Sequence, residues 1–127
     1  MSRKLYVTSK EFREGRILIG ILTEINEGNY QFEYKLNGKV QEWHLPLKEF
    51  PEVTKTYNGR DVQKFIDRMI PNKEYKFIKQ ALESVDMAEY DAWEMLRRFG
   101  KKGDSRNEVF LLDNLPERTV IYEPLAV

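Results

Sequence analysis

One histidine and no cysteine limit the chemistry available to this chain of 127 residues. His44 stands between Trp43 and Leu45, and no signature of a Ser-His-Asp or Cys-His arrangement surrounds it. A lone histidine with scattered carboxylates is a poor ligand set for zinc, whose structural sites use four ligands, mostly cysteine and histidine. No pair of carboxylates stands out for acid–base work. We therefore expect no enzyme, no metal and no cofactor, and a structural or exposed His44.

The segment 100–105, Gly-Lys-Lys-Gly-Asp-Ser, has a faint likeness to a phosphate-binding loop. It lacks the Walker spacing, and it follows an expected helix, whereas a phosphate site precedes one. We interpret this segment as a solvated loop.

Basic residues gather around the same segment, namely Arg97, Arg98, Lys101, Lys102 and Arg106. They fit a helix carboxyl end followed by a solvated turn. The alternative is a small basic patch that faces a phosphate or an acidic partner. Without exposed aromatic residues between the cations, the pattern is weak support for nucleic-acid binding.

Two tryptophans mark further positions. Trp93 lies on the apolar stripe of an expected helix, which predicts a core residue. Trp43 precedes His44 near Pro46, and it is either a core residue or the anchor of an interface, where tryptophan is enriched. We take Trp43, His44 and the five basic residues as candidate partner-binding residues.

The composition indicates one folded domain over residues 1–127 that needs no cross-links. Lys and Arg number 21, as do Asp and Glu, so no global field would attract nucleic acid or a membrane. The longest apolar runs are too short to span a bilayer, and the first residues lack the apolar core of a signal peptide. We expect a soluble, cytoplasmic protein, a location that the absence of cysteine fits.

The clearest expected element is a helix between Asn58 and Pro71. We expect Asn58 to cap it, Asp61 to occupy the capping-box position and Pro71 to end it. Its apolar positions recur at helical spacing, which puts one face against a core. They are Val62, Phe65, Ile66, Met69 and Ile70.

Strands are expected before this helix. Residues 16–22 predict a strand buried on both faces, and the alternation of residues 30–34 predicts one with an aromatic inner face. Asn37-Gly38 is a strong hairpin signal, with 40–45 as the returning strand. Weaker patterns indicate a first strand at 4–8, turns at Glu14-Gly15 and Glu27-Gly28-Asn29, and an irregular connection over 48–57.

Two helices and another strand are expected after Pro71. We place a helix over 73–82, with Tyr75, Ile78 and Leu82 on one side, and another from Asp86 to a left-handed Gly100. Residues 109–112 predict a central strand, and 119–122 a last strand or tail. Strands, helices and strands in separate runs favour an α+β domain: a small curved or barrel-like, mostly antiparallel sheet with about three helices.

Several segments together resemble the first N-terminal subdomain of HipA-type Ser/Thr kinases. That family has a G-x-L strand, an aromatic-alternating strand, an sLPL segment, a helix ending F-x-N-L-L-P and a later d-L-L-x-x-x-G element. The corresponding segments here span about residues 17–117. They are Gly20–Leu22, Tyr30–Tyr34, Leu45–Leu47, Phe65–Pro71, Trp93–Gly100, Asp104-Ser105 and Val109–Leu112.

The sequence departs from the family at Arg68, where the family has Asn, and at Asn107-Glu108, where it has Gly-Ala. No kinase catalytic half is present. In tripartite toxin–antitoxin systems of this family, a separate small protein of this kind, HipS, neutralises the kinase through a tryptophan-bearing surface. The resemblance thus implies a non-catalytic interaction module, an antitoxin-like kinase inhibitor. The alternatives are a phage-type inhibitor of a host defence nuclease and a small nucleic-acid-binding module.

Overall fold

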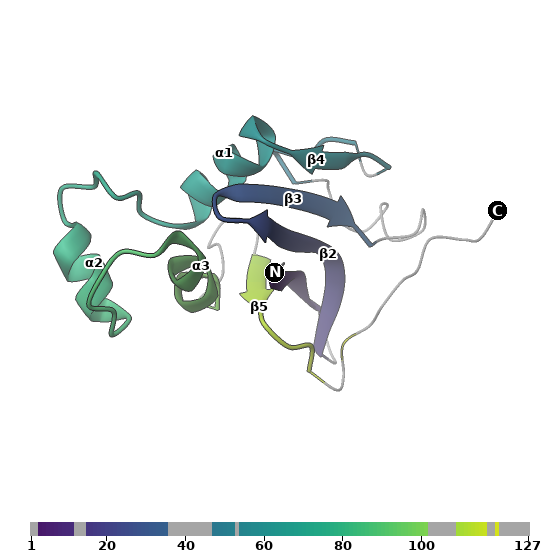
Figure 1. Ribbon diagram of the computed structural model, residues 1–127. Coiled ribbons are helices and arrows are strands. Elements are labelled where there is room, and N and C mark those ends of the chain that lie inside the picture. Colours follow the sequence, from purple (N-terminus) through teal and green to yellow (C-terminus); the bar gives the residue numbers. More distant parts are fainter. Residues whose placement is uncertain are drawn as a thin grey trace.

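Five strands form one open, antiparallel sheet in the computed structural model (Figure 1), which describes residues 3–11, 15–35, 47–52, 54–101, 109–116 and 119. The strand order is β4-β3-β2-β1-β5. The strands are β1 (Arg3–Glu11), β2 (Gly15–Asn26), β3 (Asn29–Tyr34), β4 (Thr56–Asn58) and β5 (Val109–Leu112). These five described strands form an open sheet and do not close into a barrel.

In the described part of the chain, three helices accompany the sheet: α1 (Arg60–Met69), α2 (Ile78–Ser84) and α3 (Ala92–Gly100). Helix α1 packs against β3, β4 and α3, while α3 packs against β5. Figure 1 shows α2 standing out from the sheet at the far side of α3. The predicted α+β class is confirmed.

The two strand patterns of the sequence are seen in β2 and β3. Tyr30, Phe32 and Tyr34 are buried, and the residues between them are partly exposed, as the alternation predicts. In β2, residues 17–20 are all buried. Gly20 allows the closest approach, because a Cβ there would lie 2.6 Å from the Glu33 carbonyl oxygen. The G-x-L glycine is therefore required by sheet packing.

Phe50 lies at the centre of the core, in a segment that has no regular secondary structure. It is fully buried, and its ring stacks on Phe32 with centroids 4.3 Å apart. Tyr57 and Phe65 lie beside it at 4.9 and 5.3 Å. The Tyr34 hydroxyl ties this segment to β3, because it donates to the Phe50 carbonyl (2.6 Å) and accepts from the Leu47 amide (2.9 Å).

Helix α1 begins one residue later than the sequence predicts, with Gly59 instead of Asn58 at the cap position. Asn58 does not cap it, because Asn58 belongs to β4 and pairs with Gln31. The chain turns at Gly59 with φ 60°, and no side chain caps the first turn. The end agrees with the prediction, since Ile70 is extended before Pro71.

The predicted starts of α2 and α3 are also wrong. Asp86 terminates α2 instead of starting α3: it has φ 57°, its amide bonds the Glu83 carbonyl, and the Met87 amide bonds the Leu82 carbonyl. This pair of bonds is the Schellman arrangement. Helix α3 starts later, where the Asp91 side chain accepts from the Glu94 amide at 3.1 Å.

Two further expectations for the carboxyl-terminal half are wrong. Gly100 is the last residue of α3 and has no positive φ; a Cβ there would lie 2.5 Å from the Leu111 Cβ, so the glycine permits close helix–strand packing. Within the described residues, β5 is an edge strand rather than a central one. A strand at the sheet edge can still be apolar, since α3 covers it.

Some expectations fall on residues that the structure does not describe. They are the Asn37-Gly38 hairpin with its strand 40–45, the loop beyond Lys101, and the tail beyond Thr119. The predicted turn at Glu27-Gly28 is present, with Gly28 at φ 77°. The irregular connection is confirmed for 48–52, but Thr56 and Tyr57 lie in β4.

We expect Tyr34→Phe to lower the free energy of unfolding by about 1–3 kcal/mol, because the Phe50 carbonyl and Leu47 amide would lose their partner inside the core. Urea unfolding measures the change. Tyr6→Phe is the control, since the Tyr6 hydroxyl has no hydrogen bond to any described residue. Equal stability of Tyr34→Phe and wild type would contradict this role of the hydroxyl.

Candidate interaction surface

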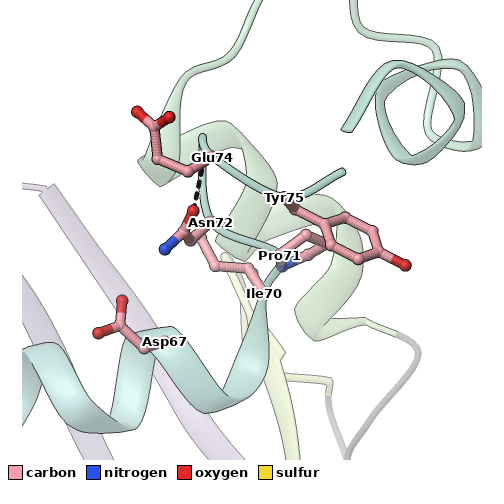
Figure 2. Close-up of a pocket in the computed structure, with 6 residues that line it drawn as sticks. All are labelled: Asp67, Ile70, Pro71, Asn72, Glu74 and Tyr75. Atoms are coloured by element: carbon pink, nitrogen blue, oxygen red, sulfur yellow. Dashed lines mark hydrogen bonds between the residues drawn. The ribbon is translucent and has the colours of Figure 1, made fainter. Parts of the chain in front are cut away.

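A cleft of about 510 Å³ lies where the chain leaves α1. Figure 2 shows Asp67 on α1 and the residues that follow the helix arranged around this hollow. Its lining residues are Asp67, Ile70, Pro71, Asn72, Glu74 and Tyr75. The cleft therefore combines an apolar floor with two carboxylates.

The connection that lines the cleft is held in a defined turn. Asn72 accepts a hydrogen bond from the Glu74 amide through its side chain (dashed in Figure 2), and its carbonyl accepts from the Tyr75 amide at 3.0 Å. This turn delays α2, which explains why the helix does not start at residue 73. The Tyr90 hydroxyl donates to the Pro71 carbonyl at 3.0 Å.

Tyr90 remains protonated for that bond. Burial, and secondarily the negative charge of Asp67, raise the pKa of the Tyr90 phenol above its ordinary value. The hydroxyl is therefore a donor at neutral pH, and it fastens the start of the connection to the segment that precedes α3.

Two aromatic residues beside the cleft face solvent. Tyr75 and Phe77 are 47% and 48% exposed, and Ile25 is the other large hydrophobic residue of the described chain that is exposed to this degree. The two rings meet edge to face with centroids 5.8 Å apart, and the Lys76 ammonium lies 5.3 Å from the Phe77 ring. We call Tyr75 and Phe77 the aromatic pair.

Helix α2, which follows the aromatic pair, is loosely attached. None of its residues is buried; Ile78 and Leu82 are only partly covered by the core. The aromatic pair and α2 together make a projecting edge with apolar side chains. Such features are typical of surfaces that bind another protein.

The helical spacing in the sequence hides this edge for a specific reason. The helical spacing predicted Tyr75 on one side of a helix over 73–82, whereas the asparagine turn leaves Tyr75 and Phe77 outside any helix. The available signal for this edge was Pro71-Asn72, which comes shortly before Tyr75 and Phe77. Asparagine after proline favours a turn over a helix.

Arg68, which stands where the HipA family has Asn, forms a largely buried ion pair. Its guanidinium donates to both Glu49 oxygens at 2.8 and 2.9 Å, and the side chains are 13% and 8% exposed. Burial alone would raise the pKa of Glu49, but the hydrogen bonds and charge of Arg68 outweigh it and hold the pKa below 4.5. The pair fastens α1 to the segment that carries Phe50.

The described residues of the basic cluster, Arg97, Arg98 and Lys101, all form ion pairs around α3. Arg97 contacts Glu94 and Asp113, the latter at 2.8 Å, and Lys101 lies 3.6 Å from Asp113. Hydrogen bonds from Arg97 lower the pKa of Asp113, so that carboxylate is charged at neutral pH. Arg98 bonds Glu94 and the carbonyls of Val85 and Asp86, the residues that end α2.

The remaining candidate residues are placed as follows. Trp43, His44, Lys102 and Arg106 lie outside the described residues. Trp93 is a core residue, as predicted, and is 3% exposed. The structure therefore brings together Arg97, Arg98 and Lys101, each with at least one carboxylate.

Within the described segments, no three histidine or acidic side chains cluster as a metal site. Over those same segments, no helix has the length and apolar character to cross a membrane. Comparison with protein-family models, curated proteins and solved structures finds no match to this chain.

We expect Arg68→Met to destabilise the protein by about 3 kcal/mol at pH 7, because it leaves the Glu49 carboxylate buried without its partner. The depressed pKa of Glu49 gives wild type a stabilisation that is present above pH 4.5 and is lost as the pH falls through the folded-state pKa. The difference between variant and wild type should therefore shrink between pH 7 and pH 4.

Urea unfolding across this pH range checks the expectation. Lys35→Met is the control, because it removes an exposed ion pair with Glu33 whose side chains are 36% and 43% exposed. A constant difference for Arg68→Met at all pH values would refute the role assigned to Glu49.

Proposed function

We propose that this chain is a non-catalytic protein-interaction module that inhibits a HipA-type Ser/Thr kinase, in the manner of an antitoxin. The proposal joins a sequence resemblance to one structural observation. That observation is the aromatic pair, exposed beside the cleft on the projecting edge formed with α2.

The arrangement of the resembling segments supports the proposal. Gly20–Leu22 lies in β2, Tyr30–Tyr34 in β3, and Phe65–Pro71 forms the end of α1. Trp93–Gly100 and Val109–Leu112 are in α3 and β5, which contact each other. These five described segments thus belong to one folded core rather than to unrelated stretches.

Inhibition by such a module needs no reactive group. A kinase must close its lobes to complete its site, so a protein that binds the open state better than the closed state opposes closure. The proposed module would do this by placing the aromatic pair, and Trp43 if it faces the kinase, against a kinase surface. Tyrosine and tryptophan contribute large contact area at low entropic cost.

Co-expression with a HipA-type kinase that lacks its own first N-terminal subdomain tests the proposal. We expect a complex on size exclusion and relief of the growth arrest that the kinase causes. Absence of both would reject the kinase-inhibitor function.

A second experiment assigns the surface. We expect Tyr75→Ala with Phe77→Ala to weaken the complex by at least about 2 kcal/mol, with little change in melting temperature, since both side chains are exposed. Ile25→Ala is the matched control, because Ile25 is an exposed apolar residue on β2, outside the aromatic pair. We expect Trp43→Ala to weaken the complex by a similar amount. If the aromatic pair could be removed without loss of affinity, the interface would lie elsewhere.

A further inference from the structure

A second hollow, of about 460 Å³, lies at the end of the sheet where α3 begins. The strand register places Arg3 opposite Glu24, and Glu24 opposite Tyr30. Directly paired residues of antiparallel strands point to the same face of a sheet, so these side chains form one row. Trp93, the second residue of α3, lies over the row with its ring nearly parallel to Tyr30, centroids 6.4 Å apart.

Two polar side chains in this pocket are buried, and their hydrogen-bonding capacity is not filled by the described residues. Glu24 is 6% exposed, and Arg3 donates twice to its Oε1, while its Oε2 has no hydrogen-bond partner among the described residues. Tyr30 is 7% exposed, and its hydroxyl has no partner in the described chain either. Buried polar groups are normally hydrogen-bonded, so both point to something that can occupy the pocket.

The charge and the walls of the pocket select the occupant. Glu27 and Asp91 also line it, so three carboxylates face the single guanidinium of Arg3. Burial and the nearby Glu24 raise the pKa of Tyr30 to about 12, so its phenol is neutral and adds no charge. The missing partner of Glu24 Oε2 must be a hydrogen-bond donor, because a carboxylate only accepts.

Arg3 already shows how a cation fits there. Its guanidinium carbon lies 5.2 Å from the Trp93 ring centroid, within cation–π range, while its side chain remains 48% exposed. Tyr90 adds another ring to the lining. The chain's own cation thus fills part of a site built from carboxylates and aromatic faces.

We propose that this pocket binds an organic cation, the ammonium or guanidinium end of an alkyl chain, between Glu24 and the rings of Tyr30 and Trp93. The cation donates to Glu24 Oε2 and to the Tyr30 oxygen, and Glu27 and Asp91 hold the rim negative. Arg3 competes with the ligand for Glu24 and Trp93. This site is distinct from the aromatic pair, and it does not depend on the kinase partner.

Titration of the full-length ¹⁵N-labelled chain tests the proposal. The probes are Nα-acetyl-lysine amide and Nα-acetyl-arginine amide, with Nα-acetyl-norleucine amide as the uncharged match. We expect the cations to shift the Trp93 indole and Tyr30 amide signals in a saturable way, and the norleucine compound to leave them in place. Trp43→Phe identifies the Trp93 indole signal. Equal shifts from the norleucine compound, or no saturable shift from the cations, would overturn the proposal.

Butylammonium distinguishes the source of the cation. Binding as tight as that of the lysine amide supports a free amine as ligand, and weaker binding supports a side chain presented by a polypeptide. Binding of Nα-acetyl-aspartate amide in place of the cations would overturn the proposal, because it would make Arg3 the recognition group.

Substitution of Glu24, which receives the ligand, and of Arg3, which competes with it, should change the binding affinity in opposite directions. We expect Glu24→Gln to weaken binding at least tenfold and Arg3→Met to tighten it about threefold or more. Glu33→Gln is the matched control, since Glu33 is a strand carboxylate that also pairs with a cation, Lys35, but does not line the pocket. Tighter or unchanged binding in Glu24→Gln would overturn the assignment.

Asp91→Asn provides a readout if Glu24→Gln fails to fold. Asparagine caps a helix as well as aspartate does, so the change removes rim charge while it keeps the start of α3. We expect about threefold weaker binding of the lysine amide in Asp91→Asn and no change in the amount of folded protein. Unchanged affinity in Asp91→Asn together with unchanged affinity in Arg3→Met would refute the site.

Discussion

The burial of Phe50 among Phe32, Tyr57 and Phe65 is the contact on which the rest of the structure depends. These rings come from an irregular segment, β3, β4 and α1, so one cluster joins four parts of the chain. Full burial of a phenylalanine contributes about 1.5–3 kcal/mol. The backbone of the irregular segment belongs to no helix or strand, so its polar groups inside the core need other partners. The Tyr34 hydroxyl supplies hydrogen bonds to it, as donor to the Phe50 carbonyl and as acceptor from the Leu47 amide. This cluster therefore helps to position α1 against β3 and β4.

Ion pairs add to the contacts of the aromatic core. Arg68 and Glu49 join α1 to the Phe50 segment in a largely buried setting. Around α3, Glu94 and Asp113 share Arg97, Arg98 and Lys101 between them and link the helix to the end of β5 and to the end of α2. Each of these described cations has a structural contact, so the basic cluster stabilises the fold locally whatever else it binds. The aromatic pair, in contrast, is exposed and does not pack in the core.

The cleft beside the aromatic pair and the proposed cation site are linked by one hydrogen bond. Tyr90 lines the cation pocket, and its hydroxyl donates to Pro71, which lines the cleft beside the aromatic pair. This bond places the proposed protein-binding edge and the proposed cation site on adjoining parts of the molecule.

The sequence by itself determined the elements whose side chains repeat with a regular period. The alternation in residues 30–34, the apolar run in 17–20 and the helical face of Val62, Phe65 and Ile66 all correspond to buried surfaces. Pro71 marked the end of α1 because a proline restricts the residue before it. These patterns express local geometry, and local geometry can be inferred from neighbours in the chain.

Only the tertiary structure decided where the helices start, that β5 lies at the edge of the described sheet, and which residues line the cleft and the proposed cation site. Asn58 pairs with Gln31 instead of capping α1, and Asp86 closes α2 instead of opening α3. Arg3, Glu24 and Tyr30 meet because the register of three strands aligns them, although no periodic pattern links them. Contacts between residues far apart in the chain outweigh local preferences worth about 1 kcal/mol or less, so they could not be derived from spacing alone.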